Sequence, residues 1–195
     1  MDIPSTIILQ DLIRCINFAA IKHKDQRRKD PESTPYINHP IGVAHILLEE
    51  GGVSDLEVLE AALLHDTVED TDTSFEEIEA MFGPRVCAIV REVTDDKTLP
   101  KATRKLLQAQ KNKVLTLISG KFQIETAPKS SKEAKLVKMA DKLYNLRDLR
   151  RCTPEGWTQP RVDEYFEWAS KVIDGLRGTN KILEEKLDLV LKNKS

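Results

Sequence analysis

Apolar residues recur at steps of three and four positions along most of this chain, and this spacing constrains the fold more than any other feature of the sequence. In the first segment such steps join Leu9, Leu12, Ile13 and Ile16, which places these side chains along one face of a helix. Few strands are needed to account for the remaining pattern. We therefore expect the chain to be built from helices.

Capping residues and glycine or proline breaks divide this pattern into separate helices. Pro40 suits the first turn of a helix because proline lacks only an N–H group that would be unpaired there, and Gly51-Gly52 ends that helix. We find no internal repeat and no linker long enough to divide the chain, so residues 1–195 are expected to form one all-α bundle of about seven to nine helices. The predicted helices cover residues 6–24, 41–50, 54–64, 73–83, 84–93, 130–149, 158–172 and 179–191.

Charge and composition exclude several classes of function. The 30 basic and 32 acidic side chains leave a formal net charge of -2, so no overall basic excess favours nucleic acid or an anionic membrane as a partner. The longest apolar runs are short, and an acid at Asp2 stands where a signal peptide carries bases, so we expect a cytoplasmic protein. Its cysteines, Cys15, Cys87 and Cys152, are widely spaced and predict reduced thiols.

A cluster of ionisable residues follows the apolar run at residues 61–64. A carboxylate at Asp66 is costly in such surroundings unless a cation or several hydrogen-bond donors compensate it. Glu69 follows His65 by four positions and Asp70 follows Asp66 by four, so each pair shares a face if the helix continues. A hydrogen-bonded core histidine would explain His65 alone, but four such groups together favour a bound cation.

Two further sites carry similar chemistry. Asp141 and Asn145 are four positions apart in an apolar helical stretch, which directs a carboxylate and an amide to the same side. His39 directly precedes Pro40 at the start of a predicted helix. Imidazole and carboxylate groups are both good ligands for divalent ions.

Three stretches of this sequence resemble a known family. They are Pro-Tyr-Ile-Asn-His-Pro at 35–40, Ala-Leu-Leu-His-Asp-Thr-Val-Glu-Asp at 62–70, and Lys-Met-Ala-Asp-Lys-Leu-Tyr-Asn-Leu-Arg at 138–147. In this order they resemble the HD-domain phosphohydrolases of the RelA/SpoT type, and most closely the small, stand-alone animal members. The resemblance extends over about residues 9–189. It implies a helical HD domain that removes the 3′-pyrophosphate of guanosine tetra- and pentaphosphate.

The resemblance also assigns roles around a metal ion. It implies one divalent ion, usually Mn²⁺ in this family, with the ligands His39, His65, Asp66 and Asp141. Glu69 and Asp70 match the acidic pair of the family's HDxxED motif, which orients the attacking water and takes its proton. Independently of the resemblance, two imidazoles and two carboxylates without a thiolate suit Mn²⁺, Fe²⁺ or Zn²⁺.

The substrate of such an enzyme is a highly phosphorylated nucleotide, so cations must line its pocket. By resemblance the substrate contacts are Arg28, Lys29, Lys101, Asn145, Arg161 and Tyr165. For Tyr165 a role as a core aromatic residue is an open alternative. The basic stretch 97–121 is read either as a solvated helix face or as a flap over an anion site.

One segment departs from the family pattern, and two other functions stay open. Residues 109–123 form an insertion that is basic and apolar, and it puts the assignment of Lys101 in doubt. The same pocket suits a phosphatase that removes the ribose phosphate of NADPH, and a non-catalytic nucleotide-binding module would keep the fold without the chemistry. We expect no synthetase activity, because the length leaves no residues for a second domain.

Overall fold

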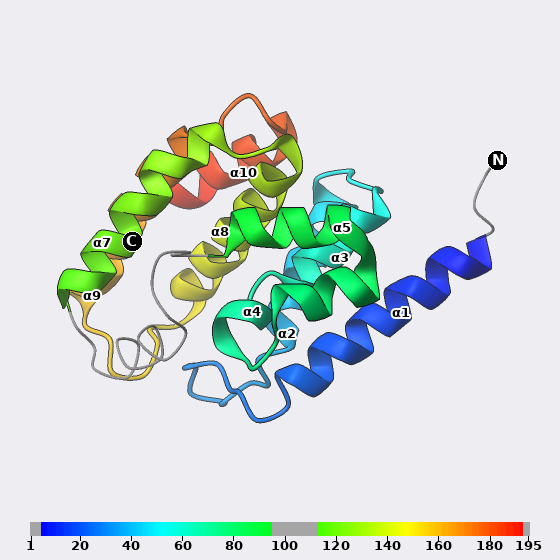
Figure 1. Cartoon of the computed structure of the whole chain (residues 1–195). Coiled ribbons are helices and arrows are strands. Elements are labelled where there is room, and N and C mark those ends of the chain that lie inside the picture. Colours follow the sequence, from blue (N-terminus) through cyan, green and yellow to red (C-terminus); the bar gives the residue numbers. More distant parts are fainter. Residues whose placement is uncertain (1–4, 95–112, 193–195) are drawn as a thin grey trace.

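The computed structural model describes residues 5–94 and 113–192, and the described residues are helical throughout, apart from connecting turns and an isolated β-bridge between Arg27 and Pro35 (Figure 1). The all-α prediction is confirmed. The helices are α1 (Ser5–Lys22), α2 (Asn38–His45) with the π-helical turn η1 (Ile46–Glu50), α3 (Leu56–Leu64), α4 (Thr67–Asp70), α5 (Phe75–Val93), α7 (Lys113–Thr126) with the 3₁₀ turn η2 (Ala127–Lys129), α8 (Lys132–Arg151), α9 (Gln159–Asp174) and α10 (Lys181–Lys192).

Several helices begin at polar cap residues, each within one position of the predicted start of its helix. The side-chain oxygens of Asp55, Ser74 and Ser131 accept hydrogen bonds from backbone N–H groups in the first turns of α3, α5 and α8. These bonds satisfy N–H groups that have no partner within the helix. The starts of these three helices are therefore fixed by local chemistry.

The third predicted helix ends at Leu64 as expected and does not continue through the His-Asp pair, so the condition under which each of the two i, i+4 pairs would share a helix face is not met. α3 ends at Leu64, and α4 begins at Thr67 after a turn that contains His65 and Asp66. The Thr67 hydroxyl donates a hydrogen bond to the Leu64 carbonyl at 2.7 Å, which satisfies one of the last carbonyls of α3. The turn, rather than a helix face, directs Asp66.

Gly83 bends α5 into two parts. Its φ of +88° lies in the left-handed region, which glycine adopts without the steric penalty of a side chain. Figure 1 shows the chain changing direction sharply at this point. The predicted helices over 73–83 and 84–93 correspond to the two parts.

The core is centred on α8. Helices α2, α3, α5, α9 and α10 all contact it, and its side chains Met139, Leu143 and Leu146 are fully buried. Because α2 and α3 also pack against each other, the start of α2, the end of α3 and the middle of α8 are held in fixed relation. None of the described helices is both long enough and apolar enough to cross a membrane.

The later part of the predicted insertion at 109–123 lies in α7. The Gly120 carbonyl accepts a hydrogen bond of 3.0 Å from the indole Nε1 of Trp168, so α7 is fixed against α9. Residues 109–112 and Lys101 lie outside the described part of the chain. The basic-flap reading of residues 97–121 is likewise outside it, except for the end of that stretch in α7.

Candidate metal centre and substrate pocket

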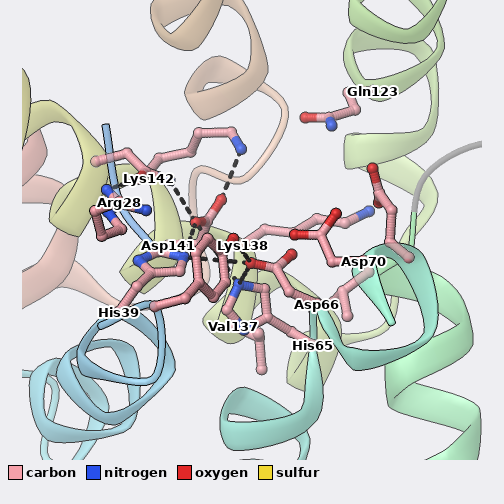
Figure 2. A pocket seen from close by; sticks show the side chains of 14 residues that line it. Arg28, His39, His65, Asp66, Asp70, Gln123, Val137, Lys138, Asp141 and Lys142 are labelled. Atoms are coloured by element: carbon pink, nitrogen blue, oxygen red, sulfur yellow. Dashed lines mark hydrogen bonds and ion pairs between the residues drawn. The ribbon is translucent and has the colours of Figure 1, made fainter. Parts of the chain in front are cut away.

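Four side chains from three separate segments meet at one point, as Figure 2 shows. His39 comes from α2, His65 and Asp66 from the turn after α3, and Asp141 from α8. The Nε2 atom of His39 lies 3.2 Å from Asp141 Oδ1 and 3.5 Å from Asp66 Oδ2. The Nε2 atom of His65 lies 3.0 Å from Asp66 Oδ2 and 3.9 Å from Asp141 Oδ1. The structure thus brings together the four residues that the resemblance assigns to a metal.

This cluster fits a divalent cation. His39, His65 and Asp141 each offer a ligand atom, and these atoms lie within 4.8 Å of one another. The His65 Nδ1 atom bonds to the Ala62 carbonyl at 2.7 Å, which fixes the ring. The buried Nε2 atom on its other side lies 3.0 Å from Asp66 Oδ2 but forms no well-aligned hydrogen bond among the described residues. A buried polar atom without a partner is costly, and a cation in the cluster would satisfy it.

The electrostatics of the cluster keep both carboxylates ionised. Burial opposes ionisation of Asp66, but the His65 and His39 imidazoles lower its pKa below the usual range. Burial also opposes ionisation of Asp141, whereas Lys142 and His39 lower its pKa well below the usual range. For His65, the Asp66 and Asp141 charges overcome burial and raise the pKa to about 9, while burial lowers the pKa of His39. Two anionic oxygens therefore face the imidazole nitrogens.

A second layer of polar groups holds Asp141 and its surroundings. Lys142 Nζ lies 2.8 Å from Asp141 Oδ2, and the Asn145 amide donates to Asp141 Oδ1 at 2.6 Å. The predicted pairing of Asp141 and Asn145 on one helix face is confirmed by this bond. Arg28 donates to Asn145 Oδ1 at 3.0 Å and to Asp148 Oδ2 at 2.8 Å, so the first loop is joined to α8.

The cluster opens into a polar pocket of about 260 Å³. Glu69 and Asp70 on α4 form one wall, and Arg28 and Asn145 are also part of the lining. Gln123 reaches the pocket from α7 (Figure 2). The full lining is Arg28, Tyr36, His39, His65, Asp66, Glu69, Asp70, Val93, Gln123, Val137, Lys138, Asp141, Lys142 and Asn145.

Three other predicted substrate residues lie outside this lining. Lys29 is exposed, and its backbone carbonyl accepts a 2.7 Å hydrogen bond from the Glu155 N–H group. The Arg161 guanidinium stacks on the Trp157 ring at 4.2 Å. Tyr165 is half-buried and packs against the rings of Trp157 and Trp168, with centroid distances of 5.9 Å and 5.1 Å.

Sequence reasoning missed several pocket residues. Tyr36 and Lys142 stand within the stretches that carry the family resemblance, so their position beside His39 and Asp141 was an available signal. Gln123 had no such signal, because it belongs to the segment that departs from the family pattern. Its place in the pocket follows from how α7 packs.

Comparison with known proteins places the chain in a family. The model of the HD domain matches residues 15–166, which is most of the chain. The chain belongs to the HD-domain family. Among HD proteins it is 65% identical over 177 residues to guanosine-3′,5′-bis(diphosphate) 3′-pyrophosphohydrolase MESH1 of Xenopus tropicalis, covering 91% of this chain and 90% of the relative. The human protein of the same name is 60% identical over 183 residues, with 94% of each chain covered.

A solved structure agrees with the sequence comparison. It belongs to a metazoan ortholog of SpoT that is described as hydrolysing ppGpp and acting in starvation responses. It superposes with a TM-score of 0.81 at 54% identity, and the match covers 97% of this chain and 96% of that one. The resemblance to the small animal members of the RelA/SpoT type is confirmed.

Proposed function

We propose that this protein hydrolyses the 3′-pyrophosphate of guanosine tetra- and pentaphosphate, giving GDP or GTP and pyrophosphate. The observation that carries the proposal is the convergence of His39, His65, Asp66 and Asp141 beside the acidic pair Glu69 and Asp70 in one pocket. The activity named for relatives that are 60% to 65% identical supports the same reaction.

One divalent ion, which we propose to be Mn²⁺, would be held by His39, His65, Asp66 and Asp141. Nitrogen and carboxylate donors without a thiolate suit this ion. When bound, it supplies a lowered pKa for a coordinated water and polarises the phosphoryl group.

The acidic pair acts on the water and its proton. Glu69 and Asp70 line the pocket beside Asp66, so we assign them to orient the water and accept its proton. The water oxygen forms a bond to the phosphorus attached to the ribose 3′ oxygen. The bond from that phosphorus to the 3′ oxygen breaks, pyrophosphate leaves, and the 3′ oxygen takes up a proton.

Cations of the chain balance the charge of the nucleotide. Arg28, Lys138 and Lys142 line the pocket and offer positive charge to phosphate oxygens. Arg28 and Asn145 are the predicted substrate contacts that line it, so we assign nucleotide binding first to them.

Product analysis tests the proposal. The purified protein is incubated with guanosine tetraphosphate and, in parallel, with NADPH, with Mn²⁺ or with EDTA. We expect GDP and pyrophosphate in equal amounts from the first substrate, and loss of the reaction in EDTA. Phosphate release from NADPH without pyrophosphate release from guanosine tetraphosphate would replace this function by the ribose phosphatase. Nucleotide binding without turnover of either compound would favour the non-catalytic module.

A further inference from the structure

The Tyr36 hydroxyl contacts a carboxylate of the metal-type cluster, which consists of His39, His65, Asp66 and Asp141. It donates a 2.6 Å hydrogen bond to Asp66 Oδ2. The same oxygen lies 3.0 Å from His65 Nε2 and 3.5 Å from His39 Nε2, so it is the Asp66 atom that faces both imidazoles. The phenol therefore acts on the oxygen that would meet a cation.

The tyrosine ring is fixed from both sides. It lies next to the rings of His23 and His39, with centroid distances of 5.0 Å and 5.7 Å, and the Arg28 guanidinium sits 5.8 Å from its centroid. Its backbone N–H group donates to the Gln26 carbonyl at 3.1 Å. The hydroxyl is thus held in place by a loop with its own hydrogen bonds, independently of Asp66.

Asp66 needs such support because of where it lies. It is the N-cap residue of α4, but its side chain makes no cap bond to a backbone N–H group, so its carboxylate can rotate about its side-chain bonds. A donor fixed on one oxygen restricts that rotation. Donors that hold a metal-binding carboxylate typically change metal affinity or activity by about 10- to 100-fold when they are removed.

We propose that Tyr36 is a positioning residue that orients the Asp66 carboxylate toward the metal site. This inference rests on the proposed role of Asp66 as a metal ligand. Tyr36 does not need to contact the substrate for this role, and its loss acts through the affinity for the ion.

Tyr144 offers a matched control. Its ring also packs on the His39 ring, with a centroid distance of 4.9 Å. The Arg28 guanidinium lies 5.6 Å from the Tyr144 ring centroid. In the part of the chain that the structure describes, the Tyr144 hydroxyl donates no hydrogen bond to a side chain of the cluster. Tyr36→Phe and Tyr144→Phe therefore each remove one hydroxyl beside His39, but only the first removes a bond to Asp66.

The experiment titrates Mn²⁺ alone into the metal-free wild type and both variants by calorimetry. The thermal unfolding midpoint of each metal-free protein is recorded in parallel. We expect Tyr36→Phe to raise the dissociation constant for Mn²⁺ about tenfold or more. The dissociation constant of Tyr144→Phe should stay within about twofold of the wild-type value. Excess Mn²⁺ should restore most of the turnover of Tyr36→Phe.

Three results would overturn the inference. The first is an unchanged dissociation constant for Tyr36→Phe, even if the metal-free variant has a lower thermal unfolding midpoint. The tyrosine would then have a purely structural role. The second is an equal loss of Mn²⁺ affinity in both variants, because the hydrogen bond to Asp66 would then not be the cause of the loss. A wild type that binds no Mn²⁺ removes the metal proposal itself, which separates that failure from a failure at Tyr36 alone.

Discussion

At the scale of single residues, the carboxylates of Glu69 and Asp70 differ in position from those of Asp66 and Asp141. The latter two face imidazole nitrogens, whereas the acidic pair lies on the adjacent wall formed by α4. A change in the acidic pair should therefore alter turnover while leaving the cluster able to hold its ion.

Glu69→Gln tests this division of roles. The amide keeps the shape of the side chain but accepts a proton far less readily, so kcat should fall by about 10²-fold or more. Metal content and circular dichroism should match the wild type. Glu76→Gln, an exposed change at the start of α5, is the control and should leave kcat unchanged. Full activity of Glu69→Gln at normal metal content would contradict the role.

The residues His39, His65, Asp66 and Asp141 were assigned to a metal through the family resemblance, and the chemistry visible in the sequence pointed to only part of the set. Imidazole and carboxylate groups after an apolar run are hard to explain otherwise, which drew attention to His65 and Asp66. Tyr36 and Lys142 were missed because a tyrosine or lysine has an ordinary structural reading at almost any position. Their role depends on which atoms they reach, and that is a property of the folded chain.

At the scale of helices, the helix starts and the end of α3 at Leu64 could be predicted, whereas the orientation of the turn that follows α3 could not. Asp55, Ser74 and Ser131 cap through bonds to residues two or three positions away, so the local sequence suffices. The local sequence gives no signal for the direction in which the turn after α3 points the side chains of His65 and Asp66. That direction depends on packing around the site, which local propensity does not include.

Gly120→Val tests the contact that fixes α7 against α9. A Cβ atom at position 120 would lie 3.0 Å from Trp168 Nε1 and 3.2 Å from Trp168 Cδ1, so the larger side chain crowds the indole and Trp168 must move away. We expect a loss of about 1–3 kcal/mol of stability, measured by urea unfolding. Because Gln123 follows one turn later and lines the pocket, KM should also rise.

The neighbouring variant Lys121→Ala provides the comparison. Its side chain is exposed, so its removal should change stability by less than about 0.5 kcal/mol. If both variants unfold at the same urea concentration as the wild type, the Gly120 contact does not fix α7.

At the scale of the whole molecule, Glu50 joins three elements. Its carboxylate on η1 pairs with Arg147 of α8 at 2.6 Å and with Lys186 of α10 at 2.9 Å. Hydrogen bonds from Arg147 exceed the opposing effect of partial burial, and together with Lys186 they lower the Glu50 pKa to about 2. This carboxylate links the beginning of the fold to its last helix.

Glu50→Gln should therefore destabilise the protein in a pH-dependent way. The folded state holds the ionised form more tightly than the unfolded chain, whose pKa is near 4.5. The contribution of about 1 kcal/mol is present above pH 4.5 and is lost as the pH falls toward 2. Urea unfolding at pH 7 and pH 3 should show a smaller difference from wild type at the lower pH. Glu185→Gln, in an exposed pair with Lys181, is the control. A difference that stays constant with pH would exclude this ion-pair origin.

The proposed ligands come from the beginning of α2, the turn after α3 and the middle of α8, so segments distant along the chain share one binding point. An ion bound there would hold early and late parts of the polypeptide together and stabilise the folded state. Removal of the ion by a chelator would then weaken the contact between these segments. Proteases should cleave the metal-free chain faster than the metal-bound chain, although the two have the same covalent structure.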